Sequence, residues 1–209
     1  MFNQCLTGGR RTAGASGVCA VSFHRLFDWL SKLFKERSTR EYPGNDTTAP
    51  TVAGQTRILL MRHAEKTGDK NDIHLSESGR KRAERLAGYI PREFGKPDFL
   101  FAAAPSKNSI RSIETLQPLA DAIGVRLNCD IEDKQFLDLT RRLISAAAYA
   151  GKLIVICWHH NSLPAIAAAL GAQPGSYPPD WDEDVFDLIV DLAYQSDAKP
   201  SVQLIRQPF

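Results

Sequence analysis

Apolar residues between positions 57 and 209 form short runs that alternate with helical stripes. The runs at 57–62, 98–104 and 153–158 predict buried strands, and the last, LIVICW, is typical of a central parallel strand covered on both faces. Apolar residues at helical spacing predict four helices with these core positions: Ala83, Leu86, Ala87 and Ile90; Ile110, Ile113, Leu116, Leu119 and Ile123; Phe136, Leu139, Leu143, Ile144 and Ala147; Leu163, Ile166, Ala167 and Leu170. This order predicts an α/β three-layer sandwich with a mostly parallel central sheet.

Local signals refine these elements. Ser76 is a suitable N-cap for the first helix of the domain, and Pro118 predicts either a kink in the second helix or its true start. The stretch VRLNC at 125–129 predicts a weak strand. The segments FDLIVDLAY and SVQLIRQ, joined by a polar turn with Pro200, predict a closing hairpin.

Residues 1–56 differ in pattern from the rest and predict an N-terminal extension to a domain at 57–209. Within it, residues 21–36 carry apolar residues at helical spacing with basic residues between them, which predicts a basic amphipathic helix. Such a helix could pack on the domain or have no role, lie on a membrane surface, or belong to an organelle-targeting segment. Residues 38–56 are polar, contain Pro and Gly, and predict a linker.

Composition excludes several classes of function. The formal charge of +2 is small and the positive residues are dispersed, so we expect no nucleic-acid partner. The four cysteines form no CxxC pair, which favours reduced thiols. No run of 18 apolar residues is present, so no transmembrane helix is expected. Together these features favour a cytoplasmic protein, apart from the alternatives that residues 21–36 leave open.

Polar residues that can bind an anion follow three of the predicted strands. Arg62 and His63 end the first strand, Arg111 lies in the loop and helix start after the second, and residues 159–161 end the strand at 153–158. Ligands of parallel sheets bind beyond the carboxyl ends of the strands, and helix N-termini there favour anions. An arginine side chain can donate two parallel hydrogen bonds to two phosphate oxygens, and a neutral imidazole is a competent nucleophile. The sequence therefore predicts an anion pocket that contains a nucleophile.

Four stretches in this order resemble the histidine phosphatase superfamily, the phosphoglycerate-mutase-like group. They cover roughly residues 57–171 and read LLMRHAEK, LSESGRKRAERLA, SIRSIETLQPLADAIG and VICWHHNSLPAIAAALG. The resemblance implies a phosphoglycerate-mutase-like fold. It also implies His63 as the phosphorylated nucleophile with Arg62 and Arg111 as phosphate clamps.

The resemblance further implies His159 as the second catalytic histidine, with its neighbour His160 as the alternative. We expect four residues to contact the substrate: His160, Glu65, Lys66 and Asn161. The third signature residue is Ala64 where the family usually has glycine, which keeps the position small. The family also uses a carboxylic acid that protonates the leaving oxygen, and this sequence offers the following candidates: Glu65, Glu114, Glu132 and Asp133.

Other polar residues have plainer interpretations. His24 and His74 have no partner in the pattern, so we expect them on the surface. The acidic segment with Trp181 and Asp182 to Asp184 is either a solvated loop or a border of the substrate entrance. We expect no metal and no cofactor. Zinc ligands usually occur in local pairs, whereas the adjacent histidines at 159–160 would point to opposite faces of an extended chain.

The leading hypothesis is a metal-independent phosphatase that acts on a small phosphorylated substrate or on phosphohistidine in a partner protein. A mutase is less favoured because only 47 residues, 112–158, separate Arg111 from His159, which leaves little room for a substrate-binding insertion. A catalytically weak phospho-ligand binding protein is the alternative from another class. Nothing in the sequence indicates an oligomeric state.

Overall fold

The structure is a computed structural model that describes residues 56–195 and 199–209. The helix predicted at 21–36 and the linker up to residue 55 lie outside the described residues. The six strands are β1 (Arg57–Arg62), β2 (Phe99–Ala102), β3 (Leu127–Asn128), β4 (Leu153–Trp158), β5 (Leu188–Ala193) and β6 (Ser201–Arg206). The helices are α2 (Glu77–Phe94), α3 (Arg111–Ile123), α4 (Phe136–Ser145) and α5 (Leu163–Ala169), with short 3-10 turns η1 (Asp133–Gln135) and η2 (Ala147–Tyr149).

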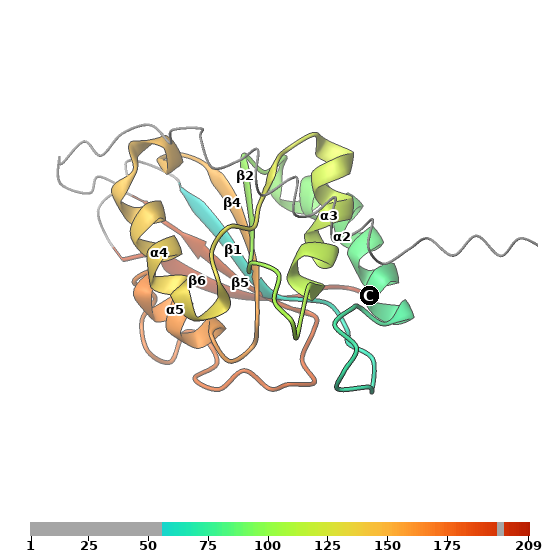
Figure 1. The fold of residues 1–209 in the computed structure, drawn as a ribbon. Coiled ribbons are helices and arrows are strands. Elements are labelled where there is room, and N and C mark those ends of the chain that lie inside the picture. The colour runs from blue at the N-terminus through green and yellow to red at the C-terminus, as the bar shows by residue number, and fades with distance from the viewer. Residues whose placement is uncertain (1–55, 196–198) are drawn as a thin grey trace, which may run out of the picture. The chain divides into compact units, whose positions relative to one another are not determined.

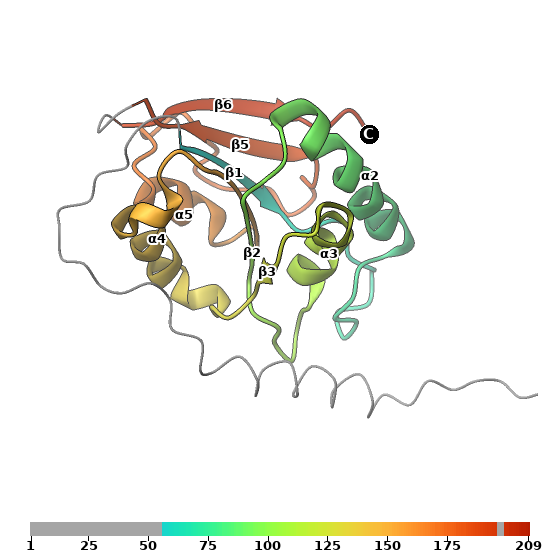
Figure 2. The ribbon, with the colours of Figure 1, turned by 90° about the horizontal axis from the view of Figure 1, so that it is seen from above.

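The strands form one sheet in the order β3-β2-β4-β1-β5-β6. The first four strands in this order are parallel, whereas β5 runs antiparallel to β1 and pairs with β6 as a hairpin. Figure 2 shows this hairpin at one edge of the sheet. The mostly parallel sheet and the hairpin are therefore confirmed. Strands β1 and β4 have the predicted bounds, while β2 is shorter than the predicted 98–104.

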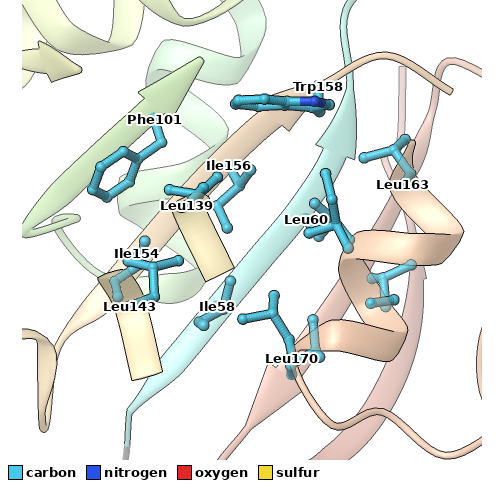
Figure 3. Packing of buried hydrophobic residues seen from close by; sticks show 14 of the residues in the cluster. Ile58, Leu60, Phe101, Leu139, Leu143, Ile154, Ile156, Trp158, Leu163 and Leu170 are labelled. Atoms are coloured by element: carbon cyan, nitrogen blue, oxygen red, sulfur yellow. The ribbon is translucent and has the colours of Figure 1, made fainter. Parts of the chain in front are cut away.

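Helices cover both faces of the sheet, with α2 and α3 on one side and α4 and α5 on the other (Figure 1). Alternation along β1 creates the two interfaces, because successive side chains of a strand point to opposite faces. Ile58 and Leu60 belong to the core with α4 and α5, which Figure 3 shows, and Leu59 and Met61 belong to the core with α2 and α3. None of the helices in the described part is long and apolar enough to cross a membrane.

Two local predictions have different outcomes. Ser76 caps α2 as predicted, and its hydroxyl accepts a hydrogen bond from the Gly79 amide at 3.0 Å. Helix α3 starts at Arg111 and continues through Pro118, so the interpretation that Pro118 marks the true start is wrong. Packing of Leu116 and Leu119 against the sheet stabilises the helix on both sides of the proline.

Helix α2 passes very close to the segment that follows β1, and a glycine permits this. A Cβ added at Gly79 would lie 2.3 Å from the carbonyl oxygen of Glu65, whereas a Cβ at Gly88 would meet nothing within 4 Å. The neighbour at Gly79 is backbone, so relief requires movement of the helix or of residues next to β1. The glycine is thus a packing requirement beside the end of β1.

We predict that Gly79→Ala lowers the free energy of unfolding by about 1 to 3 kcal/mol because of this overlap. The matched change Gly88→Ala, in the same helix, should raise it by about 0.5 to 1 kcal/mol through helix propensity. Urea unfolding of both variants measures the two effects. Equal changes in the two variants would contradict the close approach.

Candidate active site

Parallel pairing of β1 with β4 brings two distant histidines together. The ladder matches Arg62 with Trp158, and the His63 amide continues it with a hydrogen bond of 3.1 Å to the Trp158 carbonyl. His63 and His159 each follow one of these paired residues, so they leave the sheet side by side. Their ring centroids lie 5.4 Å apart with an interplanar angle of 70°. The structure therefore brings together the two histidines that follow β1 and β4.

The hydrogen bond of the His63 ring defines its tautomer. His63 is only 2% exposed, and its Nδ1 lies 2.7 Å from the carbonyl oxygen of Ala64. A carbonyl oxygen can only accept, so Nδ1 carries the proton and Nε2 has a free electron pair. No residue in 56–195 or 199–209 forms a hydrogen bond with Nε2. Burial lowers the pKa of His63 to about 3, and the charges of Arg62 and Arg111 add to this shift, although the bond to Ala64 opposes it.

Ala64 fits its position because the surroundings are closed. It is fully buried, and its amide donates to the Thr115 hydroxyl at 2.9 Å. That hydroxyl donates in turn to the Arg111 carbonyl at 2.7 Å. The residue after His63 is thereby tied to the first turn of α3.

Arg62 is a buried cation whose charge meets no carboxylate directly. The residue is 1% exposed, its Nη1 donates to the Glu183 carbonyl, and its guanidinium lies 4.0 Å from the centroid of the Phe186 ring. Its buried Nε has no hydrogen-bond partner among the described residues. Burial lowers the pKa of Arg62 to about 10, and the charges of Glu183, Asp184 and Asp182 only partly oppose this.

Arg111, at the first residue of α3, is also held by uncharged oxygen atoms. Its Nη2 donates to the Asp72 carbonyl at 2.6 Å and its Nε donates to the His74 carbonyl at 3.1 Å. Weaker contacts of 3.5 and 3.4 Å reach the Ser109 hydroxyl and the Asn108 carbonyl. Burial lowers the pKa of Arg111, while the charge of Asp72 opposes the shift.

The two guanidinium groups place positive charge near His63. Within the described part of the chain, neither Arg62 nor Arg111 forms a salt bridge, although ten other ion pairs are present. Buried charges in proteins are normally paired, because desolvation without a counter-charge is costly. Both arginines also lower the pKa of His63, so their charges act on the same place. The arrangement is suited to a tetrahedral anion beside His63 Nε2.

The structure distinguishes the two adjacent histidines. His159 lies against His63, and burial lowers its pKa, with the charges of Arg111 and Arg62 adding to the shift and that of Asp133 opposing it. Burial also lowers the pKa of His160, to which the charges of Arg62 and Lys66 contribute. His160 has no ring contact with His63 among the contacts of the described residues. We therefore propose His159 as the second catalytic histidine, with His160 nearer the rim.

Two of the four candidate acids are committed elsewhere. Glu65, which we also expected to contact the substrate, instead receives hydrogen bonds of 2.8 to 3.0 Å from Nε and Nη2 of Arg82. Glu114 accepts from His74 Nδ1 at 2.6 Å and from the Leu75 amide at 2.8 Å. Neither carboxylate is free for a leaving group. The expectation that His74 is a surface residue without a partner is wrong for the same reason.

The two remaining acids lie on the segment before α4. Asp133 is half-buried and accepts a hydrogen bond from the Ser162 hydroxyl at 2.9 Å. Its charge acts on His159 and opposes the lowering of the pKa of that histidine. Glu132 is exposed and has no side-chain hydrogen bond as N-cap of η1. The described residues contain no group of three or more His, Cys, Asp or Glu that could hold a metal ion.

The remaining predicted contacts lie at the rim. Lys66 is exposed and its Nζ lies 3.1 Å from the Glu183 carboxylate, so it joins the acidic segment rather than the clamp arginines. Asn161 is exposed in the turn before α5 and forms no side-chain hydrogen bond within the described residues. The acidic residues 182–184 are exposed, and the Glu183 carbonyl accepts a hydrogen bond from Arg62.

Sequence reasoning missed Phe186, whose ring lies under the Arg62 guanidinium and 6.2 Å from the His63 ring. The sequence analysis placed this residue at the start of the predicted strand FDLIVDLAY, beside the acidic segment, whereas β5 begins at Leu188. A single aromatic residue there has no pattern that distinguishes a pocket wall from core packing.

Similar folds occur in several solved structures. A protein described as the phosphohistidine phosphatase SixA from Nakamurella multipartitia matches with a TM-score of 0.52 and 18% identity, over 77% of this chain and 99% of that chain. The protein histidine phosphatase SixA complexed with tungstate matches with a TM-score of 0.53 and 12% identity, over 72% of this chain and 96% of that one. Phosphoglycerate mutase from Plasmodium falciparum matches with a TM-score of 0.50 and 14% identity, over 72% of this chain and 89% of that chain.

No protein-family model matches the sequence, and no curated protein is similar to it. At these identities the structural matches establish the fold. The chain therefore has a phosphoglycerate-mutase-like fold, as the resemblance implied.

We predict that His63 stays uncharged from pH 5 to pH 8, because burial and two nearby guanidinium charges disfavour its cation. Nitrogen-15 NMR of the imidazole should report the Nδ1–H tautomer throughout this range. Assignment follows from the loss of the signal in His63→Gln. A His63 titration midpoint near 6.5 would show that the two arginine charges do not act on this ring.

Proposed function

We propose that the protein is a metal-independent phosphatase that hydrolyses phosphate monoesters or phosphohistidine through a phosphohistidine intermediate on His63. The observation that carries the proposal is the state of this ring, which is neutral, donates from Nδ1 to the Ala64 carbonyl and keeps the Nε2 electron pair free. A neutral imidazole beside two guanidinium groups is a nucleophile with an anion site next to it.

In the first step, the electron pair of His63 Nε2 attacks phosphorus. The bond from phosphorus to the leaving group breaks, and its electron pair departs with the leaving group, which takes up a proton from water. Arg62 and Arg111 supply positive charge to the phosphoryl oxygens, a role that metal ions have in other phosphoryl-transfer sites. The Nδ1–H bond to Ala64 stabilises the positive charge that develops on the ring.

In the second step, water attacks phosphorus from the side opposite Nε2. The P–N bond breaks, its electron pair returns to Nε2, and inorganic phosphate leaves. His159 is suited to donate an N–H hydrogen bond to a phosphoryl oxygen in both steps because its ring lies beside His63. Asp133 is the carboxylate best situated to exchange protons with this histidine, since its charge already acts on it.

The commitment of Glu65 and Glu114 to other partners favours substrates whose leaving group needs little protonation. Aryl phosphates and phosphohistidine both meet this condition. Phosphohistidine on a partner protein is a candidate because proteins of similar fold are described as phosphohistidine phosphatases. Small phosphate esters remain candidates from the same chemistry.

We predict that the protein hydrolyses an aryl phosphate in the presence of a chelator and that His63→Ala lowers kcat about a thousandfold or more. The wild type, quenched during turnover, should carry an acid-labile phosphate that His63→Ala lacks. Phosphate binding without turnover would instead support the binding-protein alternative, and transfer to a second hydroxyl acceptor rather than to water would support a mutase.

We further predict unequal losses for the two adjacent histidines. His159→Ala should lower kcat about a hundredfold or more because it removes a donor to the transferring group, whereas His160→Ala should change kcat less than about tenfold. Steady-state kinetics on the same aryl phosphate tests this. The reverse ranking would identify His160 as the second catalytic histidine.

A further inference from the structure

Helix α3 contributes a second charged residue that is fastened to the same loop as Arg111. Arg111 donates to the carbonyl oxygens of Asp72 and His74 at 2.6 and 3.1 Å. Glu114, three residues further along the helix, accepts from His74 Nδ1 at 2.6 Å and from the Leu75 amide at 2.8 Å. Both side chains of one helical turn therefore hold the segment 72–75.

We propose that Glu114 and His74 are positioning residues for Arg111, and that they fix the loop carbonyls that orient its guanidinium toward phosphate. The inference rests on the proposed function to the extent that Arg111 binds the phosphoryl group. Both carboxylate oxygens of Glu114 are engaged by His74 and Leu75, so it acts through these two residues.

The physical reason lies in the partners of Arg111. Each hydrogen bond to a neutral carbonyl contributes only about 1 kcal/mol net, so the orientation of the guanidinium depends on how rigidly those carbonyls are held. A carboxylate partner would hold Arg111 more strongly but would cancel its charge and repel phosphate. Glu114 instead binds His74 and Leu75 of the loop, so a carboxylate holds the loop in place while Arg111 itself forms no salt bridge with any described residue.

Further contacts tie the loop to the start of α3. The Ile110 amide donates to the Ile73 carbonyl at 3.0 Å, and the His74 amide donates to the Asp72 carboxylate at 2.9 Å. The His74 and Glu114 side chains are 34% and 29% exposed, so the hydrogen bond of 2.6 Å between them is partly shielded from solvent.

The positioning role differs measurably from a general-acid role for Glu114. Loss of a general acid lowers kcat about a hundredfold or more with little effect on ground-state binding. Loss of a positioning residue weakens the binding of inorganic phosphate and raises KM. Both carboxylate oxygens of Glu114 already accept hydrogen bonds, so the second outcome is expected.

We expect Glu114→Ala to weaken inorganic phosphate binding about tenfold by calorimetry and to raise KM for an aryl phosphate similarly, with kcat changed less than about threefold. Glu114→Gln keeps an acceptor for the Leu75 amide but loses the charge, so it should change phosphate affinity and KM about threefold. This variant tests the proposal even if the alanine variant does not fold. The control Glu77→Ala removes the exposed ion pair with Lys81 in α2 and should change neither quantity.

A double-mutant cycle decides whether Glu114 acts through Arg111. In an Arg111→Ala background, Glu114→Ala should add no further loss of phosphate affinity, because the residue that it positions is absent. An equal additional loss would overturn the proposal.

The Arg111 Nε–H signal in NMR gives a readout that needs no turnover, so it separates failure of this inference from failure of the proposed hydrolysis. Glu114→Ala should shift this signal and speed its exchange with solvent, since Nε–H loses its fixed acceptor. An unchanged signal would overturn the positioning role even if the protein proves to be an active phosphatase.

Discussion

The parallel register between β1 and β4 is the constraint on which the site depends. Because Arg62 lies beside Trp158, the next residue of each strand leaves the sheet edge at the same level, and His63 meets His159. The register itself depends on the alternating core, since a slip by one residue would turn Ile58 and Leu60 away from α4 and α5. The packing energy of the two cores thereby maintains the distance between two imidazole rings.

A second constraint is electrostatic. Arg62 and Arg111 are held by carbonyl and hydroxyl oxygens and by the face of Phe186, all of which orient a guanidinium without neutralising it. The carboxylates of the acidic segment 182–184 act on Arg62 only through space and only partly offset the burial that lowers its pKa. Burial and the same charges lower the pKa of His63, so one arrangement both concentrates positive charge and leaves the ring uncharged, as the proposed nucleophile requires.

The sequence predicted the elements that show a regular spacing of apolar residues or a recognisable order of motifs. Strands β1 and β4 were predictable because continuous apolar runs end abruptly at polar pairs, and the Ser76 cap was predictable from its residue type and place. His63 and Arg111 could be proposed because motifs in order identify strand ends. By contrast, the partners of Glu65 and His74 could not be predicted. Glu65 pairs with Arg82 and His74 pairs with Glu114, and no periodic sequence pattern indicates these contacts between loop residues and helices.

The placement of carboxylates gives the site its chemical character. Glu65 anchors α2 through Arg82, which also binds the Gln207 side chain and the Phe209 carbonyl, so this acid links the nucleophile segment to the last described residues. Glu114 anchors the loop that holds Arg111. With both acids bound to basic partners, Asp133 is the candidate acid whose charge acts on His159, and its own oxygen accepts from Ser162. Under the proposed phosphatase chemistry, two guanidinium groups without salt bridges in the part of the chain that the structure describes attract phosphate while few carboxylates supply a proton, which favours leaving groups that depart with little help. This is the physical basis for weighing phosphohistidine and aryl phosphates ahead of alkyl esters in that proposal.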